Sequence, residues 1–161
     1  MNIGLIGIGT VGGGTYRVLK ENVAEISNKT GIEIKITHVA DKNLKLAKET
    51  VDKETIIEED AFALLENSSI DTIIELIGGT GIALDIVRKA LESGKHVVTA
   101  NKALIAMHGE ELIKIASTKN VLIAYEAAVA GGIPIIKALR EGLAANKINW
   151  VAGILNGTTN Y

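Results

Sequence analysis

The chain has 161 residues, of which 47% are hydrophobic and 22% charged, and its net charge at pH 7 is −2. This composition supports a buried core, and the near-neutral charge without a basic stripe argues against nucleic acid as the main partner. Because the chain has no cysteine, disulfides, thiolate metal sites and cysteine nucleophiles are excluded.

Short apolar runs alternate with amphipathic stretches from the first residue onward, which is typical of parallel βαβ units. The pattern predicts a Rossmann-type α/β fold, a doubly wound parallel sheet with helices on both faces. Strands are predicted at residues 2–7, 33–40, 71–77, 96–100 and 121–125, and helices from residue 11 past 26 and at 44–49, 58–66, 83–91 and 110–117.

The character of the chain changes after Gly131-Gly132. Pro134 can begin a helix that runs to about Leu143, and residues 149–155 are predicted as a strand without sheet partners, an edge that could pair with another chain. We therefore expect an NAD(P)-binding domain over residues 1–130 and the first elements of a substrate and dimerisation domain over 131–161.

The sequence shows no pattern typical of a membrane protein or of a secreted one. The N-terminal apolar residues follow no basic region, so they do not resemble a signal peptide. The longest weakly polar stretch, 121–139, is interrupted by charged residues, glycines and Pro134, which makes it a poor membrane span. We expect a cytoplasmic protein with no membrane partner.

A glycine loop, Gly7-Ile8-Gly9-Thr10-Val11-Gly12, follows the first predicted strand. In a dinucleotide-binding loop, Gly7 allows the tight turn, Gly9 lets the backbone approach a pyrophosphate, and Gly12 lets the helix pack closely. The alternative is a purely structural glycine turn. The position of the glycine loop between a predicted strand and a predicted helix favours dinucleotide binding over this alternative.

Asp41, at the end of the second predicted strand, is the candidate ligand of the ribose 2′-hydroxyl, although it comes later than the usual spacing of about 20 residues. A carboxylate there repels the 2′-phosphate of NADP, whereas the nearby Lys42 and Lys45 offset that repulsion. NAD or NADP is therefore expected as the cofactor, with NAD modestly favoured.

Two charged residues are further candidates for the functional site. Lys102 follows a predicted strand in a TANK turn expected to be non-helical, where its ammonium could polarise a carbonyl or hold a phosphate; the alternative is an ordinary solvated lysine. Glu126 lies among alanine and valine, so its charge must be paired, hydrogen-bonded or bound to a hard cation. A glutamate that caps a helix would give the same pattern. The three histidines lack metal-ligand spacing and are expected to be structural or surface residues.

Five motifs occur in order: GIGTVGGG at 7–14, ELIGGT at 75–80, TANKALIA at 99–106, EAAVAGGIP at 126–134 and GILNGTTNY at 153–161. Together they closely resemble homoserine dehydrogenases. The resemblance implies NAD(P)-dependent interconversion of L-homoserine and L-aspartate 4-semialdehyde, in threonine and methionine biosynthesis, by a protein whose full-length form is a homodimer.

The resemblance also implies site residues. Lys102 is implied as the catalytic lysine near nicotinamide and substrate, and a sodium ion is implied at Glu126 with the backbone carbonyls of Val129, Gly131 and Ile133. The remaining implied cofactor contacts are Thr10, Val11, Gly78, Gly79, Thr80, Asn101, Asn156, Gly157 and Thr158.

Homoserine dehydrogenases continue past the NGT loop and supply acidic substrate ligands and a second lysine there. We therefore expect this chain to be the cofactor-binding portion, inactive alone. Two alternatives stay open: a non-catalytic NAD(P)-binding regulatory module, and another Rossmann-type semialdehyde dehydrogenase or reductase.

Overall fold

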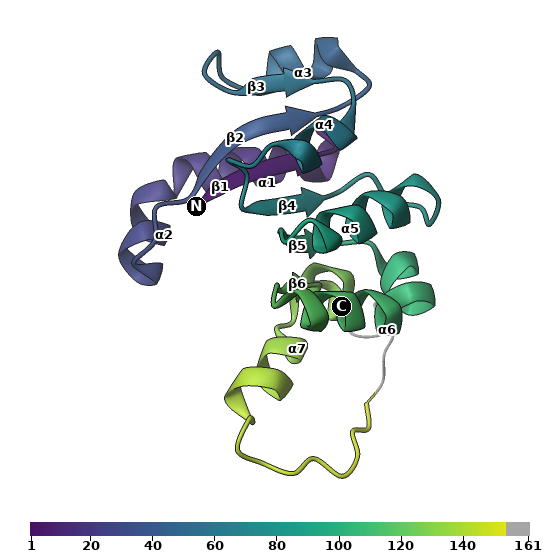
Figure 1. The fold of residues 1–161 in the computed structure, drawn as a ribbon. Helices are drawn as coiled ribbons and strands as arrows, with labels where there is room; N and C mark the ends of the chain where they lie inside the picture. Colours follow the sequence, from purple (N-terminus) through teal and green to yellow (C-terminus); the bar gives the residue numbers. More distant parts are fainter. Residues whose placement is uncertain (154–161) are drawn as a thin grey trace.

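A sheet of six parallel strands forms the centre of the computed structural model, which describes residues 1–153 (Figure 1). The strand order is β3-β2-β1-β4-β5-β6, so the order reverses at β1, as it does in a doubly wound sheet. The predicted fold class is confirmed. The strands are β1 Asn2–Ile6, β2 Lys35–Ala40, β3 Ile56–Glu58, β4 Thr72–Glu75, β5 His96–Thr99 and β6 Ile123–Ala124.

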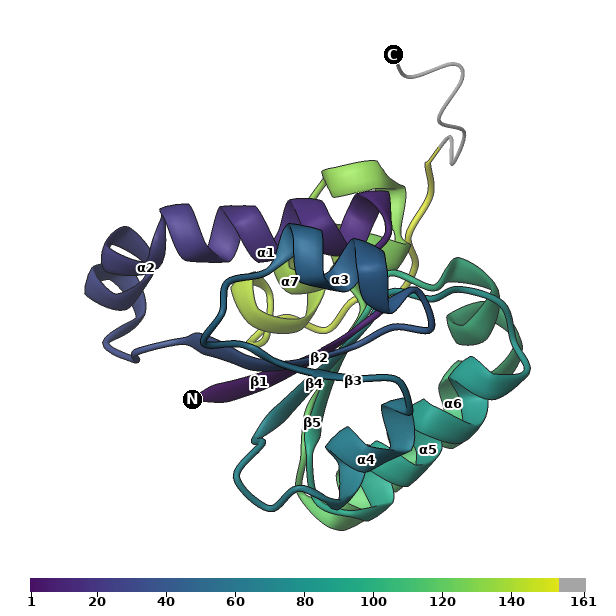
Figure 2. The same ribbon diagram turned by 90° about the horizontal axis from the view of Figure 1, so that it is seen from above.

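Helices cover both faces of this sheet (Figure 2). The helices α1 (Thr10–Glu21) and α3 (Leu44–Thr50) lie on one face, and α4 (Ala61–Glu66), α5 (Ile82–Glu92) and α6 (Lys102–Lys119) lie on the other. α2 (Val23–Thr30) extends beyond the end of α1. After β6 come two 3₁₀ turns at Glu126–Ala128 and Ala130–Gly132, the short helix α7 (Ile135–Lys137) and a π-helical turn at Ala138–Gly142.

The core consists of two apolar clusters, one against each face of the sheet. Because side chains alternate along a strand, the consecutive residues Ile73 and Ile74 of β4 enter opposite clusters. Every residue of β4 is buried. The central strands therefore read as continuous apolar runs in the sequence, as expected for parallel strands covered on both sides.

The structure corrects several predicted boundaries. The first helix is not continuous, because it ends at Glu21 and a new helix begins after Asn22. The predicted helix over 58–66 is wrong at its start: Ile56–Glu58 form β3, and the Oδ1 atom of Asp60 caps α4 by accepting the Phe62 amide at 2.9 Å. The predicted strand over 149–155 is wrong for residues 149–153, which form no strand; residues 154 and 155 lie outside the described part.

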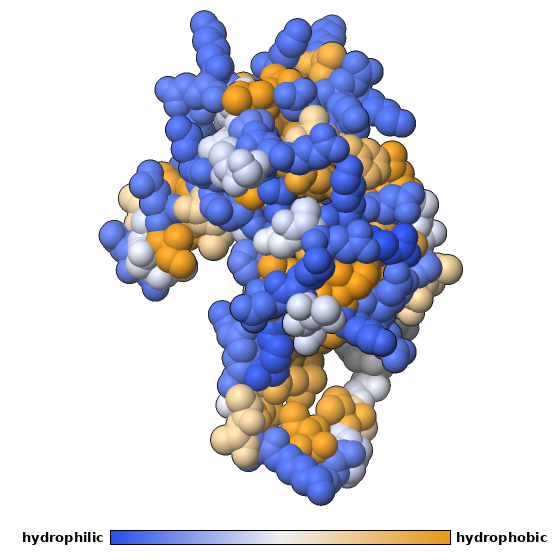
Figure 3. Space-filling model, viewed as in Figure 1, coloured by the Kyte–Doolittle hydropathy of each residue, from blue (hydrophilic) through white to orange (hydrophobic). Residues whose placement is uncertain are grey.

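The face of the molecule shown in Figure 3 is mostly hydrophilic. Exposed apolar side chains occur in the segment after α7, at the lower end of that view, and include Leu143, Ile148 and Val151. Trp150 in the same segment is 79% exposed. Within residues 1–153, no helix has both the length and the apolar character needed to cross a membrane.

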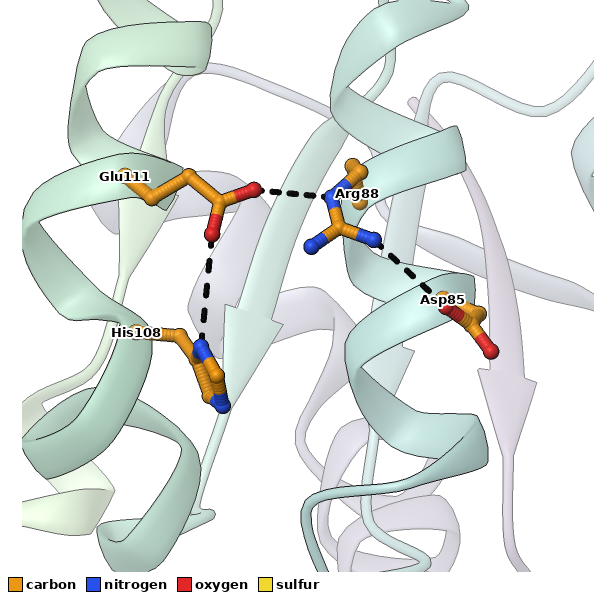
Figure 4. Close-up of polar contacts among 4 residues, drawn as sticks. All are labelled: Asp85, Arg88, His108 and Glu111. Atoms are coloured by element: carbon orange, nitrogen blue, oxygen red, sulfur yellow. Dashed lines mark hydrogen bonds and ion pairs between the residues drawn. The ribbon is translucent and has the colours of Figure 1, made fainter.

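An ionic cluster joins the neighbouring helices α5 and α6 (Figure 4). The Nε atom of Arg88 donates to Oε1 of Glu111 at 2.8 Å, and the Nη1 atom of Arg88 lies 3.5 Å from Oδ1 of Asp85. His108 Nδ1 lies 4.0 Å from Oε2 of Glu111. The hydrogen bond from Arg88 holds the pKa of Glu111 below its ordinary value of 4.5, and the same bond raises the pKa of Arg88.

The lowered pKa of Glu111 predicts a pH-dependent contribution to stability. A carboxylate whose pKa is depressed by folding stabilises the fold above its unfolded pKa and loses this effect as the pH falls through the folded value. We expect Glu111→Gln to lower the melting temperature slightly at pH 7, with the difference from wild type shrinking as the pH falls below 4.5, in thermal unfolding at low salt. A difference that stays constant from pH 7 down into the acid-unfolding range would contradict the ionic contribution.

Candidate functional site

The glycine loop connects β1 to α1, as predicted, and two of its glycines have measurable geometric roles. Gly7 has a φ of +93°, a left-handed conformation that favours glycine, and its amide donates to the carbonyl of Ala40 at 2.9 Å. A Cβ on Gly12 would lie 1.8 Å from the carbonyl oxygen of Gly7. Gly12 therefore lets α1 start directly against the loop.

The beginning of α1 faces open space. Gly9 occupies the N-cap position, and because it has no side chain it cannot cap the first amides of the helix. A Cβ on Gly9 would meet no atom within 4 Å, and Thr10 and Val11 are exposed. Free amides at the positive end of a helix are suited to bind a phosphate.

Asp41 holds the glycine loop to the end of β2. Its Oδ2 atom accepts the Ile8 amide at 2.7 Å, and its Oδ1 atom accepts the Asn43 amide at 2.7 Å. The sequence did not predict this bond to the glycine loop. Each carboxylate oxygen can accept a second hydrogen bond, so the role of Asp41 toward a ribose hydroxyl stays a prediction.

A hollow of about 340 Å³ opens at the carboxyl ends of β1, β2 and β4, the edge where open α/β sheets bind ligands. Its volume falls in the range of small-molecule sites. Apolar walls from the β4–α5 connection and charged residues after β2 line it, including Asp41, Lys42, Ile77, Gly78 and Ile82. Besides the Lys42 ammonium, the charged groups that line it are three carboxylates, those of Asp41, Glu59 and Asp60. An apolar cleft with hydrogen-bonding groups at its rim suits a nucleoside.

The connection between β4 and α5 contains two consecutive left-handed glycines. Gly78 has a φ of +72° and Gly79 a φ of +75°, while a Cβ on either would meet no atom within 4 Å. Backbone conformation, rather than crowding, therefore requires glycine at both positions. Thr80, the third residue implied for this loop, is half-buried.

Lys102 is the first residue of α6, so the prediction of a non-helical TANK turn holds for Ala100 and Asn101 and is wrong for Lys102. Asn101 caps this helix, because its Oδ1 atom accepts the Leu104 amide at 3.1 Å. The Nδ2 atom of Asn101 also donates to the carbonyl of Gly79 at 2.6 Å. The structure thus brings Asn101 and Lys102 beside the glycine connection after β4. An exposed lysine at the positive end of a helix is electrostatically unfavourable unless an anionic or electron-rich group lies nearby.

Glu75 was missed as a site residue, although it is the one charge in the apolar run TIIELI. It is fully buried, and its carboxylate accepts hydrogen bonds from Ile77, Gly78 and Thr99. The pattern that could have identified Glu75 is a carboxylate at the end of a strand that is otherwise apolar, because a buried charge needs hydrogen-bond partners.

Glu126 has the helix-capping role that the sequence left open as an alternative to a cation. Its Oε1 atom accepts the Ile136 amide at 3.0 Å and its Oε2 atom accepts the Lys137 amide at 2.8 Å. The carbonyl of Ile133 accepts the Ile135 amide at 2.8 Å. Three oxygens of the implied sodium set, both from the Glu126 carboxylate and one from the Ile133 carbonyl, therefore already accept one hydrogen bond each. The set fits a cation in part.

The other predicted positions have simpler outcomes. His38 contacts Thr37 and Asn67, and the Nδ1 atom of His96 accepts the Leu122 amide, so both have structural partners. Within residues 1–153, no cluster of three or more histidine and acidic side chains could hold a metal ion. Asn156, Gly157 and Thr158 lie outside the described residues.

The strand order, the glycine loop and the hollow at the carboxyl edge define a Rossmann-type dinucleotide-binding domain. A family model described as the NAD-binding domain of homoserine dehydrogenase matches residues 7–126, and a homoserine dehydrogenase model matches residues 134–161. The chain belongs to the homoserine dehydrogenase family.

Individual relatives agree with this assignment. The chain is 52% identical over its whole length to homoserine dehydrogenases from Neisseria gonorrhoeae and Pseudomonas aeruginosa, and spans 37% of the length of each. A crystal structure of a homoserine dehydrogenase from Thiobacillus denitrificans matches 99% of this chain and 37% of that one, with a TM-score of 0.89 and 49% identity. A hyperthermophilic archaeal homoserine dehydrogenase in complex with NADPH matches 89% of this chain and 49% of that one, with a TM-score of 0.71 and 27% identity.

Proposed function

We propose that this chain is the cofactor-binding part of a homoserine dehydrogenase, which interconverts L-homoserine and L-aspartate 4-semialdehyde with NAD or NADP. The observation that carries the proposal is the family match along the chain, together with a glycine loop whose geometry suits a dinucleotide. The family also implies a cytoplasmic homodimer acting in threonine and methionine biosynthesis. Because the chain spans 37% of the length of its relatives, we propose that turnover requires the longer protein.

Each element has a proposed part in holding the dinucleotide. The free amides at the start of α1 would bind the pyrophosphate, and the hollow between Asp41 and Ile77 would hold the adenosine. The Gly78–Thr80 connection and Asn101 would border the nicotinamide ribose. The bound cofactor supplies hydride chemistry. The sodium ion implied at Glu126, Val129, Gly131 and Ile133 would support the segment after β6, and no step of the reaction depends on it.

Lys102 is proposed to lie near the reacting carbonyl, where its ammonium would stabilise the developing charge on oxygen. In a form of the protein that oxidises L-homoserine, Lys102→Met is expected to lower kcat by about 10² to 10⁴. Steady-state kinetics with NAD and NADP measure this effect, and Lys102→Arg, which keeps the charge, should retain more activity. If kcat is unchanged in Lys102→Met, the lysine has no catalytic role.

Binding of the reduced cofactors tests the proposed function directly. The 161-residue chain is expected to enhance and shift the fluorescence of NADH or NADPH, and the two titrations together give the cofactor preference. Assaying L-homoserine oxidation by the longer protein separates the enzyme from a non-catalytic module, which would bind the cofactor but need no Lys102. A chain that binds neither dinucleotide contradicts both readings.

A further inference from the structure

A buried carboxylate lies beneath the two segments proposed to flank the nicotinamide. Glu75, the last residue of β4, is 0% exposed. Its Oε1 atom accepts the amides of Ile77 at 2.9 Å and Gly78 at 3.0 Å. Among the ion pairs of residues 1–153, none includes Glu75. Its charge is therefore accommodated by hydrogen bonds from nearby donors.

Thr99 extends this contact to the neighbouring strand. Glu75 and Thr99 are register partners at the ends of the parallel strands β4 and β5. The Oγ1 atom of Thr99 donates to Oε2 of Glu75 at 2.6 Å and accepts the Asn101 amide at 3.0 Å. Thr99 is fully buried and Asn101 is buried as well. A single hydroxyl thus joins the carboxylate to the start of α6.

The hydrogen bonds close into a circuit. The Asn101 amide donates to Oγ1 of Thr99, and the Oδ1 atom of Asn101 caps α6. The Nδ2 atom of Asn101 donates to the Gly79 carbonyl and so leads back to the β4–α5 connection. The connection needs such support, because a Cβ on Gly78 or Gly79 would meet no atom within 4 Å. On the side where a Cβ would stand, no side chain packs against this glycine pair, and hydrogen bonds hold the Gly78 amide and the Gly79 carbonyl.

We propose that Glu75 is a positioning residue, which acts through Thr99 to hold the Ile77–Gly79 connection and the Asn101–Lys102 helix start in fixed relative positions. The inference rests on the proposed function, since these two segments are the ones assigned to the nicotinamide end of the cofactor. It assigns Glu75 no contact with the substrate.

Burial alone does not account for the network. Thr72, at the other end of β4, is also buried, yet its Oγ1 atom has no hydrogen-bond partner within the described residues. A buried threonine hydroxyl in this sheet therefore does not require a carboxylate partner. Thr72 also supplies a matched control for Thr99, because Thr72→Val removes a buried threonine hydroxyl at the start of β4, whereas Thr99 lies at the end of β5 beside Glu75.

The first test is cofactor binding by the chain and its Thr99→Val, Thr99→Ser, Thr72→Val and Glu75→Gln variants. We expect Thr99→Val to weaken binding of NADPH and NADH about tenfold, in line with the loss of hydrogen bonds to a charged group. Its affinity for ADP, which lacks the nicotinamide half, should change less than about twofold. Thr99→Ser should restore NADPH binding, Thr72→Val should match wild type, and Glu75→Gln should be at least as impaired as Thr99→Val.

The second test is amide hydrogen exchange without cofactor. Thr99→Val is expected to speed exchange at Gly78 and Asn101 together, whereas Thr72→Val leaves both unchanged. The proposal is overturned if Thr99→Val weakens NADPH and ADP equally, or if exchange rises at only one of the two segments. A wild-type chain that binds no dinucleotide overturns the proposed function instead, and the exchange data still decide whether Thr99 couples the two segments.

Discussion

Gly12→Ala is expected to lower the free energy of unfolding by about 3 kcal/mol, at the upper end of what overpacking costs, and to abolish NAD(P)H binding. The new methyl group would fall 1.8 Å from the Gly7 carbonyl oxygen, which belongs to the backbone and has no flexible end that can move aside. Helix α1 must then shift away from the loop, and its first amides shift with it. Urea unfolding and NADPH fluorescence titration measure the two effects.

Gly14 supplies a matched control in the same helix. A Cβ at Gly14 would meet no atom within 4 Å, so alanine there should only reduce backbone entropy in the unfolded chain. We expect Gly14→Ala to raise the free energy of unfolding by about 0.5–1 kcal/mol. If Gly12→Ala is as stable as Gly14→Ala, the close contact between Gly12 and the loop does not govern the fold.

Asp41→Ala is expected to destabilise the chain by about 2 kcal/mol and to weaken dinucleotide binding at least tenfold. The substitution removes the acceptor of the Ile8 and Asn43 amides, and Ile8 is buried, so its amide is not readily hydrated. The loss of stability and the loss of binding have the same cause, because Asp41 holds the glycine loop in place. Chemical unfolding and titration with NADH and NADPH test them.

The comparison of the two cofactors separates the roles of Asp41. Equal losses for NADH and NADPH would indicate that Asp41 acts only by holding the loop. A larger loss for NADH would indicate that Asp41 also accepts a hydrogen bond from the 2′-hydroxyl of the adenosine ribose. NADPH carries a phosphate in place of this free hydroxyl. If Asp41→Ala leaves both stability and binding unchanged, neither role holds.

The sequence was sufficient to predict the main strands and the edge of the sheet where the candidate site lies. β1, β4 and β5 are apolar runs bounded by turn residues, and parallel topology then places their carboxyl ends together. Shorter or less periodic elements were not recognised. β3 has only three residues, too few for an alternating pattern, and α6 begins eight residues earlier than predicted, at Lys102 instead of residue 110. Its first turns are nearly all apolar, so no helical face is visible there.

The contacts of the candidate site that join residues far apart in the sequence could not be predicted from the sequence alone. The sequence DTIIELI shows a carboxylate at the end of a strand, yet its partner Thr99 is 24 residues away and follows only from the register of β4 with β5. The second role of Asp41 likewise depends on a loop 33 residues earlier. Glu126 illustrates the opposite case: both a cation and a helix cap were consistent with the sequence, and the structure shows the amides that its two oxygens accept.

The position of β1 in the middle of the sheet also constrains the order in which the chain can fold. β1 precedes both of its partners along the chain: it pairs with β2 on one side and with β4 on the other, and Ile6 meets its β4 partner at residue 75. The Asn2 amide and the Asp71 carboxylate that join these strands are separated by 69 residues. During translation one edge of β1 stays unpaired until β4 has emerged, and pairings of such long range slow folding. The strand that leads into the glycine loop is thus paired on both sides only after the chain has been made as far as residue 75.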